Sequence, residues 1–216
     1  MKNWSRKKKL LLWIPLLLIS LFFIGSISEW SSPTLEIAIR RKEKQQLIGP
    51  SEIIGHIQYG YQNDDHLYLG ETEHGWITYE YIGDLGWDSA ELRYFPREEN
   101  VTMFCTDFLL RTESESWLPI FVFTDQQKAA LAEMTISVTG IDSSCVYRLD
   151  GEKQAVGYFL FSLPGEELGT ERFWLLQQSI TNSYQEYILN GTVEIHIEFY
   201  DHAGKPIDTY SKAVTK

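Results

Sequence analysis

The chain has 216 residues, of which 44% are hydrophobic, 14% aromatic and 23% charged. These proportions are typical of a folded globular protein with one ordinary domain or two small ones, and they exclude a low-complexity chain. The first nine residues carry five positive charges and no negative one, so the rest carries −16 to give the chain's net charge of −11. A domain this acidic is repelled by phosphate backbones, and we therefore expect no nucleic-acid binding.

The N-terminal region predicts a membrane anchor. Residues 10–27, LLLWIPLLLISLFFIGSI, contain no charged side chain. As a helix they would span about 27 Å, close to the thickness of a hydrocarbon core. Because the basic residues precede this run, residues 1–9 are predicted to form a cytoplasmic tail and residues 10–28 a transmembrane signal-anchor helix, with the C-terminal domain extracytoplasmic. The alternative is a signal peptide cleaved after Ser28, and the domain is exported in both cases.

The next two segments are a predicted connector and a predicted β-meander. Residues 29–50 are interpreted as a connector, either a solvated linker or an edge strand, because Ser31, Ser32 and Pro33 would end any preceding helix. The basic run 40–44 within it could also rest on anionic headgroups. From Ile53 to Phe95, short alternating segments are separated by polar turns. That pattern predicts a three- or four-stranded antiparallel meander, assigned to residues 51–97.

The second half, residues 98–216, is also rich in predicted strands. Their regular spacing predicts a β-sandwich-like domain with one or two short helices, so the fold class is mainly β. The segment DQQKAALAE is expected to form a helix starting at Thr124 or Asp125, and PGEELG a helical turn. In TVEIHIEFY, apolar and polar residues alternate from Thr192 to Tyr200, and IDTYSKAV returns after a turn, which predicts a hairpin with one buried face.

Two cysteines, Cys105 and Cys145, belong to the predicted exported part. In an oxidising compartment they could pair and close a loop of about 40 residues. The alternative is two buried free thiols that behave as small hydrophobic side chains.

Motifs that would indicate catalysis or cofactor binding are missing from the sequence. It contains no glycine-rich phosphate loop, no G-x-S-x-G elbow and no C-x-x-C. Two polar groups could in principle hold a metal, namely Glu194, His196 and Glu198, and His66, Glu71, Glu73 and His74. Each also fits a solvated strand face or turn, so we expect no metal, no cofactor and no enzymatic activity. The 30 acidic residues nevertheless leave a carboxylate pair open.

Aromatic residues are dense in the predicted meander. Tyr and Trp commonly anchor protein partners or stack on sugars, and the alternative is that they fill a core. The solvent exposure of these side chains decides between the two interpretations, since only exposed aromatic residues can bind a partner. The candidate interaction residues are Tyr59, Tyr61, Trp76, Tyr79, Tyr81 and Trp87.

Three features carry a resemblance: the KKKLLLWIPLLL start, the meander ending at Gly86-Trp87, and the late FYDHAGKPI hairpin. The layout resembles single-span exported proteins of unknown function in Gram-positive bacteria such as bacilli. That resemblance implies topology and host, and it brings no catalytic residues. The leading hypothesis is a non-catalytic binding domain at the outer membrane surface that contacts another envelope protein. The alternatives are an envelope hydrolase acting on a cell-wall polymer, and an assembly role in which the anchor itself makes the contacts.

Overall fold

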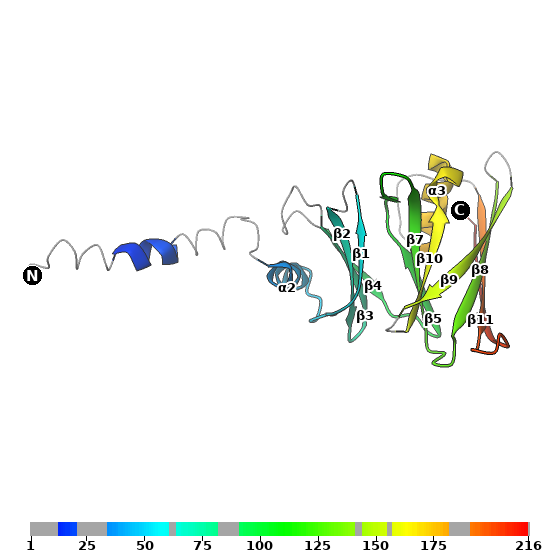
Figure 1. The fold of residues 1–216 in the computed structure, drawn as a ribbon, viewed down its shortest axis with the longest axis horizontal. Helices are drawn as coiled ribbons and strands as arrows, with labels where there is room; N and C mark the ends of the chain where they lie inside the picture. The colour runs from blue at the N-terminus through cyan, green and yellow to red at the C-terminus, as the bar shows by residue number, and fades with distance from the viewer. Residues whose placement is uncertain are drawn as a thin grey trace, which may run out of the picture.

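The computed structural model describes residues 13–20, 34–60, 64–81, 91–140, 144–154, 157–181 and 191–215. They form antiparallel sheets with short helices, which confirms the mainly β prediction. Along the long axis of the domain, Figure 1 shows helix α2, a small sheet, part of a larger sheet, helix α3, and then the remaining strands of the larger sheet.

The small sheet is the predicted antiparallel meander, and it has four strands. Its strands lie in chain order and are all antiparallel. They are β1 (Glu52–Tyr59), β2 (Asp65–Thr72), β3 (Gly75–Tyr81) and β4 (Leu92–Pro96). A two-residue turn joins β2 to β3, since Thr72 pairs with Gly75.

The larger sheet has the order β12-β11-β8-β9-β10-β7-β5, and the short β6 also pairs with β7. Its strands are β5 (Val101–Cys105), β6 (Leu110–Arg111), β7 (Ser116–Thr124), β8 (Leu131–Thr139), β9 (Cys145–Lys153), β10 (Tyr158–Pro164), β11 (Thr192–Tyr200) and β12 (Pro206–Thr215). A short 3-10 helix, η4 (Gly165–Glu167), follows β10 at the predicted helical turn.

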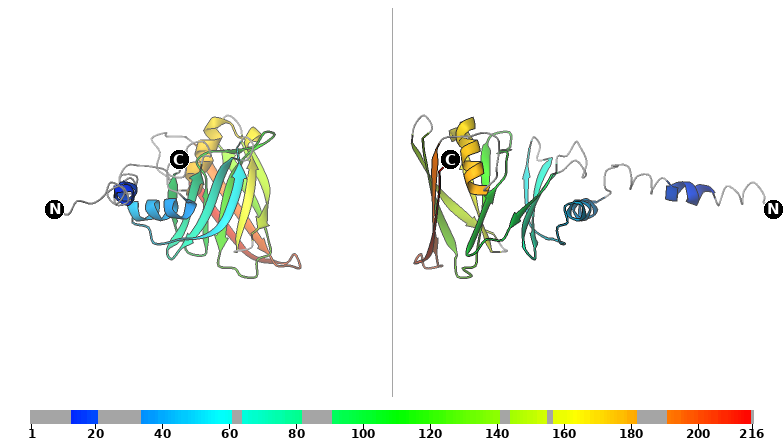
Figure 2. Two further views of the ribbon diagram at one scale, coloured as in Figure 1. Left: turned by 60° about the vertical axis from the view of Figure 1, so that its left-hand side comes forward. Right: turned by 180° about the vertical axis from the view of Figure 1, so that it is seen from behind.

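Helix α3 (Thr170–Thr181) fills the concave side of the larger sheet. Its residues Phe173, Leu176 and Ile180 are three and four positions apart, so they share one face, and they are buried in the same core as the inner side chains of the strands. Figure 2 shows the sheet curving around this helix. At the C-terminal end of α3, Lys212 of β12 donates a hydrogen bond to the Ile180 carbonyl (3.3 Å), which is favourable because that end carries unpaired carbonyls.

The predicted β-sandwich is therefore replaced by one curled sheet wrapped around a helix. Alternation along a strand does not say whether the opposing layer is a second sheet or a helix. The α3 segment, TERFWLLQQSIT, was not predicted as a helix.

Helix α2 (Leu35–Gln45) lies within the segment interpreted as a linker or edge strand. Leu35, Ala38 and Ile39 form its apolar face and pack on the outer side of the meander. Thr34 caps it by accepting a hydrogen bond from the Ile37 amide (3.3 Å). The buried Glu43 carboxylate accepts a hydrogen bond from the Ser51 amide (2.9 Å), which attaches the helix to the start of β1.

The predicted helix DQQKAALAE is wrong. Residues 125–130 form a turn, and strand β8 begins at Leu131. The alternation of Ala132, Met134 and Ile136, all buried, belongs to a strand, and pairing with β11 decides the conformation because the Ala130 amide donates to the Tyr200 carbonyl (2.7 Å).

The predicted C-terminal hairpin is confirmed. Val193, Ile195, Ile197 and Phe199 are almost completely buried, while the alternate positions face outward. At the turn, the Asp201 carboxylate accepts hydrogen bonds from the amides of residues 203 and 205 (2.8 and 2.9 Å).

The N-terminal segment is described only from Trp13 to Ser20, which is helical. No helix among the described residues is long and apolar enough to cross a membrane. Residues 10–12 and 21–28 of the predicted span lie outside the described part.

The meander and the larger sheet share an aromatic core. Phe104 of β5 is 1% exposed, and its ring stacks on Phe95 of β4 with centroids 4.0 Å apart. On its other side Phe104 contacts Phe121 of β7, at a centroid distance of 5.3 Å. The two sheets therefore form one packed unit.

Replacing Phe104 with Ala is expected to lower the free energy of unfolding by about 3–5 kcal/mol, because it leaves a cavity in this shared core. Denaturant unfolding followed by tryptophan fluorescence and far-UV circular dichroism measures the effect. The exposed Leu131→Ala serves as control and should change stability by about 0.5 kcal/mol or less. The two probes should report coincident transitions, whereas separate transitions in the unmodified protein would contradict a shared core.

Candidate functional site

A cleft opens in the larger sheet where β9 and β10 diverge. Strand β10 pairs with β7 over seven residues, and β9 pairs with β8 over seven residues. Between β9 and β10, however, the register contains only Phe159 with Lys153 and Leu160 with Glu152. Beyond these pairs, the described parts of β9 and β10 have no ladder with each other.

The backbone of β10 presents hydrogen-bonding groups to this cleft. The Gln154 amide donates to the Tyr158 carbonyl (2.8 Å), so the backbone groups of Tyr158 face β9. The N–H and C=O groups of successive residues in a strand point to opposite neighbours. Those of Leu160 and Ser162 therefore face β9, as those of Tyr158 do. Pro119 of β7, which lies opposite Ser162, agrees with this assignment, because proline has no N–H to donate across that pair.

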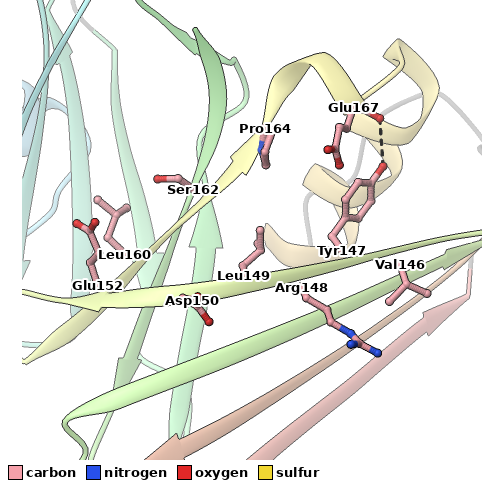
Figure 3. A pocket seen from close by; sticks show the side chains of 10 residues that line it. All are labelled: Val146, Tyr147, Arg148, Leu149, Asp150, Glu152, Leu160, Ser162, Pro164 and Glu167. Carbon is pink, nitrogen blue, oxygen red and sulfur yellow. Dashed lines mark hydrogen bonds between the residues drawn. The ribbon is translucent and has the colours of Figure 1, made fainter.

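The other wall of the cleft follows from the same alternation. Since Glu152 is directly opposite Leu160, the backbone groups of Asp150, Arg148 and Val146 face the cleft. The side chains of Arg148 and Val146 lie on the outer surface, and Val146 is 58% exposed. Figure 3 shows the two strands separating, with these residues along β9 and Leu160, Ser162 and Pro164 along β10.

The floor of the cleft is closed by the segment that follows β10. Tyr147 points inward from β9, and its hydroxyl donates to the Glu167 carbonyl (3.2 Å) (Figure 3). Burial, followed by a hydrogen bond to Cys145, raises the pKa of Tyr147 to about 12, so the hydroxyl keeps its proton at neutral pH. This contact bridges the widening gap between the strands and leaves a cleft of about 370 Å³ above it.

A second hollow, of about 750 Å³, continues the cleft along the outer face of β10. It reaches Ile57 of the meander and Trp117 of β7, and it shares Leu160, Ser162 and Pro164 with the first. We call the two hollows together the β10 groove. Within the groove, Leu160 and Pro164 form an apolar strip beside the open strand edges.

Acidic side chains dominate the rim of the β10 groove. Only one basic residue, Arg148, lies among the described residues that line it. The acidic residues are Glu115, Asp150, Glu152, Glu166 and Glu167. The local field therefore favours a cationic ligand.

The predicted interaction aromatics do not form an exposed patch. Tyr59 and Trp76 are each 5% exposed and lie in the core between the two sheets, and Tyr79 is fully buried beneath α2. Tyr81 is half-buried against the same core. Tyr61 and Trp87 lie outside the described residues. Tyr59, Trp76 and Tyr79 therefore fill the core. The meander is covered by the larger sheet on one face and by α2 on the other.

The two cysteines are free thiols. Cys105 lies in the core on β5 and Cys145 is half-buried at the start of β9. Strands β10 and β7 lie between them, which gives a separation along the sheet of at least about 14 Å. A disulfide requires Cα atoms within about 7 Å, so the pairing considered from sequence is not formed.

Neither predicted acidic and histidine group assembles a metal site. Within the described residues, no three His, Cys, Asp or Glu side chains converge on one point. His196 contacts Ser211 (2.8 Å) and Glu198 (3.4 Å) on an outward strand face. Glu71 instead binds Arg97, at 2.8 Å.

A polar network lies between the meander and the larger sheet. Tyr59 donates a hydrogen bond to Glu80 (2.7 Å), and Arg93 of β4 forms an ion pair with Asp107. Burial is the main cause that raises the pKa of Glu80, and the charge of Asp107 raises it further. The carboxyl group of Glu80 is thus less stable in its charged form than in water.

Comparisons with protein-family models, curated proteins and solved structures find no match for this chain. The candidate site therefore depends on the geometry alone. The sequence pattern did not predict the β10 groove. One residue in the sequence hints at the groove, namely Pro119, a proline in the middle of the apolar strand β7. It indicates the direction of the β10 backbone only once β10 is known to be the neighbouring strand.

The raised pKa of Glu80 predicts a pH-dependent difference between the protein and Glu80→Gln. The folded state binds this proton more tightly than the unfolded state does, so the protein gains stability relative to the variant as the pH falls through the raised pKa of Glu80 towards 4.5, the ordinary value for glutamate. Urea unfolding at several pH values measures this difference. Glu113→Gln, at an exposed turn, is the control. An equal pH dependence in both variants would contradict the assignment.

The free thiols predict distinct reactivities. In the native protein, a maleimide reagent should modify Cys145 and spare Cys105, which is buried and whose pKa is raised by that burial. Both should react after denaturation without reductant, as read by intact mass. An unreactive protein lighter by two hydrogens would instead indicate a disulfide.

Proposed function

We propose that this chain is a non-catalytic binding module of the cell envelope, which accepts an extended segment of another envelope protein in the cleft between β9 and β10. The segment adds as a strand between the two walls and supplies the backbone partners that they lack. The observation that carries this proposal is the divergence of the two strands after only two paired residues.

Open strand edges favour an extended polypeptide over other ligands. Each wall offers alternating N–H and C=O groups, from Ser162 on β10 and from Arg148 and Asp150 on β9. A strand satisfies such groups along its whole length, which is the basis of recognition by strand addition. The apolar strip formed by Leu160 and Pro164 then gives alternate side chains of the ligand a surface to cover.

The charge of the rim favours a basic segment. Glu166 and Glu167 lie beside the apolar strip, and Asp150 and Glu152 lie on the opposite wall. A ligand strand with Lys or Arg at alternate positions would place these charges near the carboxylates, which increases the association rate as well as the specificity.

The location proposed for the module is the outer surface of a membrane. The uncharged run from residue 10 to 28, preceded by five basic residues, supports a signal anchor with a cytoplasmic N-terminus. The described part of this run, Trp13–Ser20, is helical, and its large apolar side chains are at least half exposed. Exposed apolar side chains of this kind are favourable in contact with lipid.

The test compares two substitutions at one position in the full-length protein. Ser162→Pro removes the N–H that faces the cleft and leaves the β7 ladder intact, while Ser162→Ala keeps that N–H and removes only the hydroxyl. The probe is a peptide of about ten residues with alternating Lys and Val, a length typical of one strand. Binding measured by calorimetry should be lost in Ser162→Pro and kept in Ser162→Ala.

A peptide in which Glu replaces Lys separates backbone pairing from charge. It should bind more weakly than the Lys peptide, because it meets the acidic rim. Equal binding of the Lys peptide to both Ser162 variants, or no binding to the unmodified protein, would contradict strand addition.

A further inference from the structure

Two histidines meet on the outer face of the meander, away from the β10 groove. His56 of β1 and His66 of β2 lie diagonally across the strand pair, since His56 is opposite Tyr68 and His66 is opposite Gln58. The Nε2 atom of His56 and the Nδ1 atom of His66 are 2.8 Å apart. His56 is exposed and His66 is half-buried, so solvent reaches the pair.

Neighbouring tyrosines hold both imidazole rings in place. His56 stacks on Tyr68, with centroids 4.6 Å apart and planes within 7°. His66 stacks on Tyr81 at 5.6 Å. Both tyrosines are themselves packed against the core beneath α2, so the orientation of the two rings is coupled to that core. The two nitrogens are therefore held close together at the surface.

The separation of the two nitrogens fits two adjacent ligands of one metal ion. A metal–imidazole bond is about 2.0–2.1 Å long, so two such nitrogens lie about 2.9 Å apart at a right angle and about 3.4 Å apart at a tetrahedral angle. The hydrogen-bonded nitrogens, 2.8 Å apart, are close to the right-angle distance, so a rotation of the two rings would direct both nitrogens at one ion. A right angle is typical of tetragonal Cu²⁺, which also binds nitrogen ligands more tightly than the other divalent first-row ions do.

Metal binding requires a change of tautomer in one of the two rings. In the metal-free pair one ring donates its N–H to the other. When both nitrogens bind the metal, the donor ring carries this proton on its other nitrogen instead.

We propose that His56 and His66 form a two-histidine site for Cu²⁺, with water in the remaining coordination positions. No third His, Cys, Asp or Glu converges there within the described part of the chain, so the ion is held at the surface and remains exchangeable. This inference is independent of the proposed strand binding, because the two histidines lie on the outer face of the meander and the cleft between β9 and β10 lies in the larger sheet.

The test is a Cu²⁺ titration of the full-length protein in detergent, read by electron paramagnetic resonance and calorimetry. One ion per chain should bind, with a spectrum split by two equivalent nitrogens. Loss of one ligand in His56→Gln or His66→Gln should weaken binding by at least about tenfold, since even outer-shell changes cost about 10–100-fold. His74→Gln, at an exposed turn, is the matched control and should bind as the unmodified protein does.

A second measurement avoids any effect of the substitutions on folding. In the unmodified protein, bound Cu²⁺ should protect His56 and His66 from modification by diethylpyrocarbonate and leave His74 reactive, as mapped by peptide mass. Unchanged affinity in both ligand variants, no protection, or Zn²⁺ binding more tightly than Cu²⁺ would overturn the proposal.

Discussion

Burial of strand β7 on both faces is the constraint on which the rest of the structure depends. Leu118, Ile120 and Val122 point into the core that contains α3, while Phe121 and Phe123 point into the core shared with the meander. A strand covered on both sides reads as a continuous apolar run, and SWLPIFVFT is such a run. The two sheets therefore fold as one unit around this strand, with β5 and β10 beside it on either side.

The cleft is a consequence of how the same sheet accommodates α3. Strand β10 is held along its whole length by β7, whereas β9 follows β8 as the sheet curls around the helix. Because β10 stays paired with β7 and β9 stays paired with β8, β9 and β10 move apart as the sheet curls. Near the start of this separation Gly151 lies against the Phe161 ring, where a Cβ atom would be only 2.6 Å from a ring carbon. A glycine is required there because the aromatic core fills the space that a side chain would need.

Sequence reasoning recovered the elements whose pattern is local. The meander and the C-terminal hairpin were predicted because alternation and turn residues describe them within about twenty residues. Helix α2 was misread because Leu35, Ile37 and Ile39 also alternate with period two, and only the meander surface selects the helical face. Residues 125–133 were misread in the opposite sense, since helix propensity was outweighed by pairing with β11. The β10 groove and the His56–His66 pair depend on which strands are neighbours, and that information is not local.

Hydrogen exchange of individual backbone amides in the isolated protein, followed by NMR, tests the central claim that the edges of β9 and β10 are unpaired. The amides of Ser162, Arg148 and Asp150 should exchange quickly, although they lie in the middle of a sheet. Those of Phe161 and Leu149, which face β7 and β8, should exchange slowly. Equal protection of both sets would mean that the cleft is closed in solution and would contradict the account.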